Sequence, residues 1–215
     1  MSAQKIIVVN NDITFIPDTK GYKELDKGKN ILFVGRIFPQ KGLEFLLDTA
    51  QKVIGIDPQV KFLIGGDGIM IPQVVQSIAE RELEKNVLLT GWVNSSVKKQ
   101  LYKSGDLFVM PSPSEPFGLT ALEAIKSGVP VISSKHCGFL DVVPSTPTFE
   151  YYDTHKFAEM ILHYIDNKKS CKIFSRLSKK SFPSISGQIK LLKSYNKSNS
   201  HVGEILNELI QSLLE

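Results

Sequence analysis

The stretch VMPSPSEPFGLTALEAIKSGVPV, residues 109–131, decides the fold of this chain. It starts at the end of an apolar run and continues through a loop rich in proline and serine. A helix is predicted from Phe117-Gly118 to about residue 127, and Gly128 and Pro130 then end it. Another apolar run follows at 131–133. The order of strand, loop, helix and strand is typical of one unit in a parallel α/β sheet.

The predicted helix start is suited to an anionic ligand. The first N–H groups of a helix have no partner within it and carry about half a positive charge, so they attract phosphate. Gly118 has no side chain, and we expect a ligand to approach the backbone there. Glu115 and Glu123 can each accept hydrogen bonds from hydroxyls. A phosphate between two such carboxylates matches a nucleotide-sugar, which consists of ribose, diphosphate and hexose.

Apolar runs and helical patterns alternate along the middle of the chain. Strands are predicted at 31–34, 60–64, 87–89, 107–110, 131–133 and 148–151. Further helices are predicted at 43–54, 71–83, 97–104 and 153–167. This alternation predicts a Rossmann-like, doubly wound parallel α/β sheet, in which ligands bind beyond the carboxyl ends of the strands.

The loop after the first predicted strand, GRIFPQKG at 35–42, contributes two cations. Arg36 can hold a phosphate through two parallel N–H bonds, and Lys41 adds a compact charge. Each charge-assisted hydrogen bond contributes about 1.5–3 kcal/mol. Two cations and a helix end therefore supply most of the roughly 8 kcal/mol of micromolar binding. We expect this loop to face the helix start at Gly118.

Other nucleotide and metal motifs are excluded. The turn Gly65-Gly66-Asp67-Gly68 lacks the third glycine of a dinucleotide fingerprint and follows the second strand, so it does not indicate NAD. We interpret it as a tight turn that lets a base or sugar approach. No Walker A loop is present. The four histidines and two cysteines lack metal-ligand spacing and no Asp-x-Asp pair occurs, so we expect no metal.

Composition indicates an ordinary globular protein. The 215 residues are 42% hydrophobic and 22% charged, enough for one well-buried domain with additional elements. No apolar run approaches the roughly 20 residues that span a bilayer. The N-terminus has no basic-then-apolar leader, and the two cysteines form no pattern, so we expect a cytoplasmic location.

The net charge of +4 is unevenly distributed. Nine Lys or Arg residues and no Asp or Glu lie in 168–197. This basic stretch is either a solvated helical surface or a peripheral contact with the anionic inner face of the membrane. We expect no nucleic-acid partner. We divide the chain into a strand and interdomain linker at 1–30, a nucleotide-sugar-binding domain at 31–197, and a C-terminal amphipathic helix at 198–215.

These motifs resemble the C-terminal, donor-binding domain of family 4 retaining glycosyltransferases of the GT-B fold, the glycosyl transferases group 1. The resemblance covers about residues 31–167. Its motifs are VGRIFPQKG, the 65–68 turn, TGWV, PSPSEPFGLTALEAIKSGVPVIS and CGFLD. The chain departs from the family at Asn11, where the family has glycine. It departs again at 137–141, where the family reads Gly-Gly-x-x-Glu and this chain has Cys137 and Asp141.

The resemblance implies a role for each motif. Arg36 and Lys41 would bind the diphosphate, and Glu115, which would contact the hexose hydroxyls, completes the implied catalytic set. Glu123 would bind the ribose. The remaining implied substrate-binding residues are Gly35, Gly66, Gly68, Trp92 at the base pocket, Phe117, Gly118, Leu119 and Thr120.

The implied activity is transfer of a hexose from a nucleoside diphosphate sugar to an acceptor hydroxyl, with retention of configuration. UDP-hexose is the expected donor, and neither a metal nor another cofactor is expected. The partner is an N-terminal acceptor-binding domain, or a separate subunit, without which this half is expected to be inactive. The alternatives are a non-catalytic nucleotide-sugar-binding subunit of a split enzyme and half of a nucleotide-sugar 2-epimerase.

Overall fold

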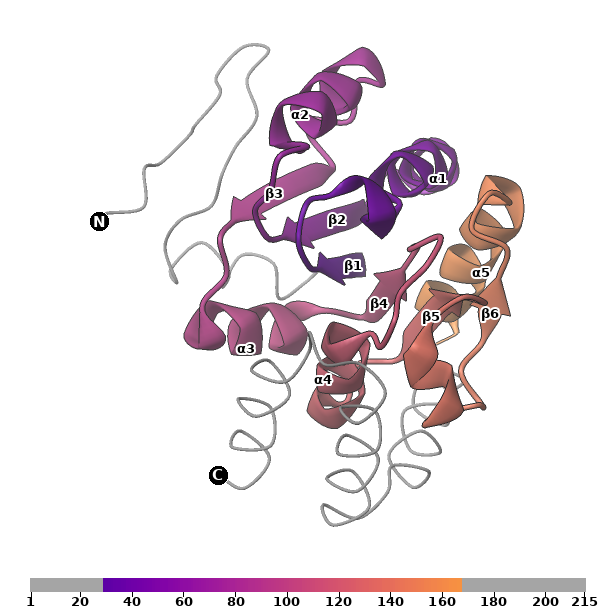
Figure 1. Cartoon of the computed structure of the whole chain (residues 1–215). Helices are drawn as coiled ribbons and strands as arrows, with labels where there is room; N and C mark the ends of the chain where they lie inside the picture. The colour runs from indigo at the N-terminus through magenta and orange to yellow at the C-terminus, as the bar shows by residue number, and fades with distance from the viewer. Residues whose placement is uncertain (1–28, 168–215) are drawn as a thin grey trace.

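The structure is a computed structural model and describes residues 29–167 (Figure 1). At its centre is a six-stranded sheet in the order β3-β2-β1-β4-β5-β6, with every neighbouring pair parallel. The strands are β1 (Lys29–Val34), β2 (Val60–Gly65), β3 (Val87–Gly91), β4 (Leu107–Met110), β5 (Val131–Ser134) and β6 (Thr148–Phe149). This sheet confirms the predicted doubly wound α/β fold.

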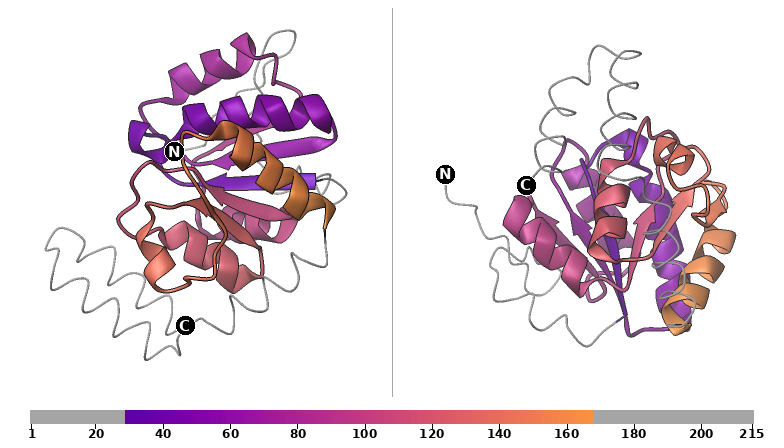
Figure 2. Two further views of the ribbon diagram at one scale, coloured as in Figure 1. Left: turned by 90° about the vertical axis from the view of Figure 1, so that its right-hand side faces the viewer. Right: turned by 90° about the horizontal axis from the view of Figure 1, so that it is seen from below.

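Helices cover both faces of the sheet (Figures 1 and 2). One face carries α1 (Leu43–Ile56), α2 (Ile71–Glu80) and α5 (Thr154–Asp166), and the other carries α3 (Ser95–Ser104) and α4 (Leu119–Ser127). Two short 3-10 helices, η2 (Pro39–Lys41) and η3 (Gly138–Asp141), lie in loops.

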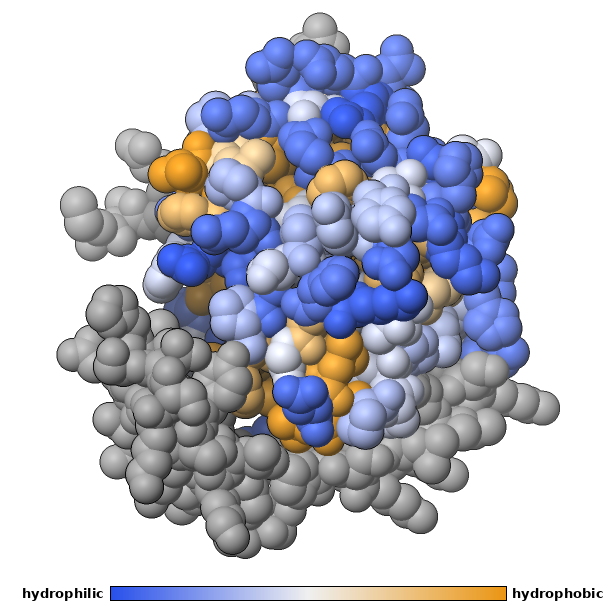
Figure 3. Space-filling model, turned by 45° about the vertical axis from the view of Figure 1, so that its right-hand side comes forward, coloured by the Kyte–Doolittle hydropathy of each residue, from blue (hydrophilic) through white to orange (hydrophobic). Residues whose placement is uncertain are grey.

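The core forms because each strand buries both of its faces. In β1, Ile31 and Phe33 pack into the cluster under α1, α2 and α5, whereas Leu32 and Val34 pack into the cluster under α3 and α4. Successive side chains of a strand point to opposite faces, so a continuous apolar run fills both layers. The face in Figure 3 is accordingly mostly hydrophilic, and hydrophobic side chains show on it only in small separate areas.

Two stacked phenylalanines hold α5 against the edge of the sheet. The rings of Phe149 in β6 and Phe157 in α5 lie 3.9 Å apart between centroids with planes 12° apart, and both side chains are buried. We expect Phe157→Ala to lower the free energy of unfolding by about 3–5 kcal/mol, because it leaves a cavity in this stack. Chemical denaturation of the chain measures the change. His155→Ala on the exposed side of α5 is the matched control, and an equal loss in both variants would contradict this account of the core.

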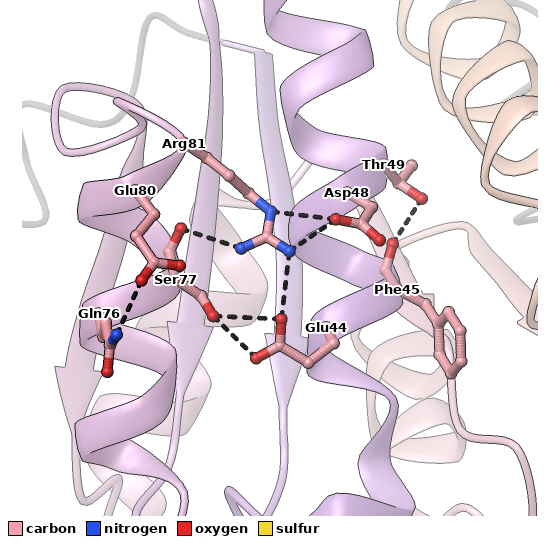
Figure 4. A network of polar contacts seen from close by, with 8 residues as sticks. All are labelled: Glu44, Phe45, Asp48, Thr49, Gln76, Ser77, Glu80 and Arg81. Carbon is pink, nitrogen blue, oxygen red and sulfur yellow. Dashed lines mark hydrogen bonds and ion pairs between the residues drawn. The ribbon is translucent and has the colours of Figure 1, made fainter.

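A polar network fixes α2 on α1 (Figure 4). The Arg81 guanidinium lies 2.7 Å from an Asp48 oxygen and 3.3 Å from a Glu44 oxygen. The Ser77 hydroxyl donates to the same Glu44 carboxylate at 2.9 Å. These contacts connect the C-terminal half of α2 to α1.

Most elements differ from their predicted bounds by one to three residues, and three of these differences have a local cause. β1 begins at Lys29, two residues earlier than expected, because Asn30 is buried in the strand. α2 ends at Glu80 instead of residue 83, because Glu82 adopts a left-handed conformation with φ of 55°. Leu83 is nevertheless buried. β6 stops at Phe149, where Glu150 and Asp153 close a turn.

Several predictions lie outside the described residues. These are the interdomain segment at 1–28, the basic stretch 168–197 and the helix at 198–215, so the three-part domain division stays a prediction. Within residues 29–167, no helix is both long and apolar enough to cross a membrane.

Candidate functional site

The candidate site lies where the order of the strands reverses. β1 and β4 are neighbours at the centre of the sheet, but the chain continues from β1 to β2 on one side and from β4 to β5 on the other. The loops after β1 and β4 therefore diverge, which leaves a crevice at the carboxyl ends of these strands. The 35–42 loop follows β1, and the loop with Glu115 follows β4.

These two loops contact each other, as the sequence predicts. The Lys41 ammonium forms an ion pair with the Glu115 carboxylate, and the two side chains are only 16% and 12% exposed. The backbones also approach closely, because a methyl group on Gly42 would lie 2.2 Å from the carbonyl oxygen of Pro111. The site thus places a cation and a carboxylate in direct contact at the start of α4.

The backbone of Glu115 is held by the segment after β5. Its N–H donates to the carbonyl of His136 at 2.9 Å, and its carbonyl accepts from Gly138 at 2.9 Å. The CGFLD motif therefore lies beside the loop of Glu115. Asp141, at the position of the family's glutamate, is exposed at the end of η3.

The start of α4 offers two backbone donors. The helix begins at Leu119, with Gly118 as its N-cap and no side-chain cap. Within residues 29–167, no acceptor pairs with the N–H groups of Leu119 and Thr120. Such unpaired donors at a helix start bind anions.

Gly118 has a structural role that the sequence analysis did not predict. Its φ is 84°, a conformation that favours glycine, and a methyl group there would lie 2.8 Å from the Phe139 ring. The direction that a side chain would take from Gly118 therefore points toward Phe139 and Met110. The glycine allows the sharp entry into α4, and the unpaired N–H groups of Leu119 and Thr120 follow it.

Arg36 is exposed and lies in the same 35–42 loop as Lys41. Its guanidinium carbon lies 5.1 Å from the centroid of the Phe38 ring, a cation–π contact that favours an ordered side chain. No carboxylate in the described part of the chain pairs with Arg36. Arg36 is therefore a cation with free capacity for an anion, whereas Lys41 is already paired.

Glu123 is held against α3, a contact that sequence reasoning missed. Lys98 donates to one carboxylate oxygen at 3.0 Å, and the Tyr102 hydroxyl donates to the other at 2.8 Å. Burial, together with the neighbouring Glu123, raises the pKa of Tyr102, so the hydroxyl keeps its proton. Lys98 and Tyr102 lie four residues apart on one helix face, but this spacing does not indicate which residue they contact.

The glycine turn after β2 contacts the chain's own loops. Gly66 donates to the carbonyl of Gly91 at 2.9 Å, and a methyl group on Gly66 would lie 1.8 Å from the Gly35 carbonyl oxygen. A methyl group on Gly68 would meet the Ile37 carbonyl oxygen at 2.3 Å. These glycines therefore let the loops after β1 and β2 pack together. The close approach of a base or sugar to their backbone stays a prediction.

The two predicted aromatic site residues, Trp92 and Phe117, lie in loops that follow different strands. Trp92 follows β3 and is 78% exposed, so its ring is accessible for stacking with a planar group. Phe117 precedes Gly118 and is partly buried. Cys137, where the family has glycine, is buried, and burial raises the pKa of its thiol. Among the described residues, no group of three or more His, Cys, Asp or Glu is placed to hold a metal ion.

A protein-family model identifies the family of this chain. The model for the glycosyl transferases group 1 matches residues 16–181. The chain belongs to this family. An uncharacterized glycosyltransferase of Methanocaldococcus jannaschii is 38% identical over 118 residues, which are 55% of this chain and 30% of that protein. The chain thus spans less than two thirds of the length of this glycosyl transferase relative.

Solved structures of glycosyl transferases share the fold. The C-terminal domain of a group 1 glycosyl transferase, LpcC from Francisella tularensis, matches with a TM-score of 0.66 and 20% identity, over 78% of this chain and 93% of that domain. The TarM protein of S. aureus matches with a TM-score of 0.71 and 23% identity, over 89% of this chain and 38% of TarM. These likenesses identify the fold as that of the GT-B glycosyltransferases. They are consistent with this chain corresponding to the C-terminal domain of that fold.

Proposed function

We propose that this chain is the donor-binding half of a retaining glycosyltransferase. It binds a nucleoside diphosphate hexose and transfers the hexose to an acceptor hydroxyl, together with an acceptor-binding domain or partner subunit. The observation that carries this proposal is the Lys41–Glu115 pair at the start of α4. It brings together a cation for phosphate, a carboxylate for sugar hydroxyls and unpaired helix N–H groups.

In this proposal the diphosphate lies between the 35–42 loop and the first turn of α4. Negative charge develops on the leaving diphosphate during transfer, and Lys41, Arg36 and the N–H groups of Leu119 and Thr120 stabilise it. Fixed donors of this kind act strongly because they need no rearrangement at the moment of reaction. We propose that these groups meet the charge of the diphosphate without a metal ion.

Donor binding exchanges the partners of the ion pair. In the structure, Lys41 and Glu115 neutralise each other. A bound donor offers phosphate oxygens to Lys41 and hexose hydroxyls to Glu115, so both charges regain a partner when the pair separates. Glu115 then orients the hexose and Lys41 holds its leaving group. The two residues act on opposite sides of the bond that breaks.

The nucleotide of this proposal is UDP. TarM, which shares the fold, was solved with UDP, and this supports UDP as the first nucleotide to test. In this proposal the base stacks on the ring of Trp92, which is exposed and follows β3.

A thermal-shift screen tests the proposed donor class. The chain is heated with UDP-, ADP- and GDP-hexoses, with inorganic sulfate as a control for non-specific anion binding. A ligand at 100 times its dissociation constant stabilises the native state by about 2.7 kcal/mol, which raises the melting temperature by several degrees. We expect the largest rise with a UDP-hexose. If every nucleotide sugar shifts the melting temperature no more than sulfate does, the proposed function is wrong.

A further inference from the structure

The carboxylate of Glu123 is oriented by two side chains of the neighbouring helix. α3 and α4 lie side by side on one face of the sheet (Figure 1). Tyr102 donates its hydroxyl to Oε2 of Glu123 at 2.8 Å, and Lys98 donates to Oε1 at 3.0 Å. Each carboxylate oxygen therefore has one donor from α3, so the plane of the carboxylate is fixed.

Tyr102 is itself held rigidly. Its side chain is only 4% exposed, and its ring packs against Phe108 of β4 with centroids 6.2 Å apart. The hydroxyl also lies 3.1 Å from the carbonyl oxygen of Thr120 in the first turn of α4. One buried hydroxyl thus contacts both the carboxylate and the helix turn that carries the proposed phosphate donors.

Glu123 retains capacity for a ligand. A carboxylate has about four acceptor positions, and α3 occupies two of them. The side chains of Glu123 and Lys98 are 30% and 29% exposed, so one side of this pair is open to water. The Glu123 carboxylate thus has a buried donor on one side and is partly exposed on the other. This arrangement is typical of a binding group that is oriented by its neighbours.

We propose that Tyr102 and Lys98 are positioning residues that fix the Glu123 carboxylate to accept the ribose hydroxyls of the donor nucleotide. This inference rests on the proposed function, in which Glu123 binds the ribose. A carboxylate that is already oriented loses little freedom on binding, so its hydrogen bonds to the ribose contribute more to affinity. Tyr102 supplies the orientation and Lys98 adds a charge that favours the same rotamer.

Calorimetry with two nucleotides tests this role. The 215-residue chain is titrated with UDP and with its 2′,3′-dideoxy counterpart, which lacks the ribose hydroxyls. We expect the native chain to bind UDP about 10- to 100-fold more tightly than the dideoxy nucleotide, because hydrogen bonds to a charged group are lost. Tyr102→Phe should weaken binding of UDP by about tenfold and leave binding of the dideoxy nucleotide nearly unchanged. The ratio of the two affinities, for UDP and for the dideoxy nucleotide, would then fall toward one.

Two further variants make the result decisive. Tyr152→Phe removes the same hydroxyl from an exposed tyrosine and should keep the native preference. Lys98→Met lies at a partly exposed position, where folding is insensitive to the change, and should lower the preference by a few-fold.

The outcomes separate this inference from the proposed function. If the native chain binds UDP and prefers it over the dideoxy nucleotide, but neither Tyr102→Phe nor Lys98→Met changes that preference, the positioning role is wrong and the donor site stands. An equal loss for both nucleotides in Tyr102→Phe would indicate a purely structural role and would also overturn the inference. A native chain that binds neither nucleotide would overturn both proposals.

Discussion

Glu115→Gln is expected to abolish hexose transfer in the full-length enzyme while the chain still binds free UDP, at least as tightly as the native chain. Transfer needs the Glu115 carboxylate to orient the hexose, and loss of one such contact in the transition state typically lowers the rate about 10²- to 10³-fold. Binding of UDP responds in the opposite direction. Lys41 no longer has a carboxylate partner, so it is free for the diphosphate. We expect UDP affinity to rise about two- to tenfold.

Glu150→Gln is the matched control for this prediction. Glu150 also pairs with a lysine, Lys135 at 2.8 Å, but lies beyond β6. This variant should change neither transfer nor UDP binding. A Glu115→Gln chain that loses UDP binding in proportion to transfer would show that Glu115 supports the nucleotide itself, and the assignment of this residue to the hexose would be wrong.

Lys41→Met should reduce UDP affinity by about 10- to 100-fold. The variant loses a charge-assisted contact worth about 1.5–3 kcal/mol. It also leaves the Glu115 carboxylate, which is only 12% exposed, without its partner and next to the diphosphate. Repulsion between two anions adds to the loss. Isothermal titration calorimetry with UDP at two salt concentrations measures the effect, and the difference should shrink at high salt.

A double variant tests the coupling between the two residues. Because part of the Lys41→Met loss comes from the unpaired Glu115, adding Glu115→Gln should recover a fraction of the UDP affinity. Lys126→Met, on the exposed side of α4, is the control and should bind UDP normally. A double variant that binds UDP no better than Lys41→Met alone would contradict the unpaired Glu115 carboxylate as a cause of the loss.

The strands at the centre of the fold were predictable because their apolar runs are continuous. Residues 107–110 form β4 with the predicted bounds, and 31–34 make up all but the start of β1. Asn30 was placed in a linker because it is polar. In the structure it is buried in β1, where its side chain donates to the carbonyl of Ser104 and its backbone N–H donates to Asp106. Such pairing depends on a loop more than 70 residues away.

The meeting of Lys41 and Glu115 was also predictable, since both follow the carboxyl ends of strands that the topology makes neighbours. The contacts of Glu123 were not. They require α3 to pack on α4 in one register, and helix patterns give no information on which helices become neighbours. The orientation of Gly118 was missed for the same reason, because Phe139 approaches it from a distant loop.

The most direct test of the site is a crystal structure of this chain with a bound UDP-hexose. We expect the diphosphate between Arg36, Lys41 and the N–H groups of Leu119 and Thr120, with the Lys41 ammonium moved from Glu115 to a phosphate oxygen. A nucleotide bound elsewhere on the chain, or bound here with the Lys41–Glu115 pair intact, would contradict the proposed donor site.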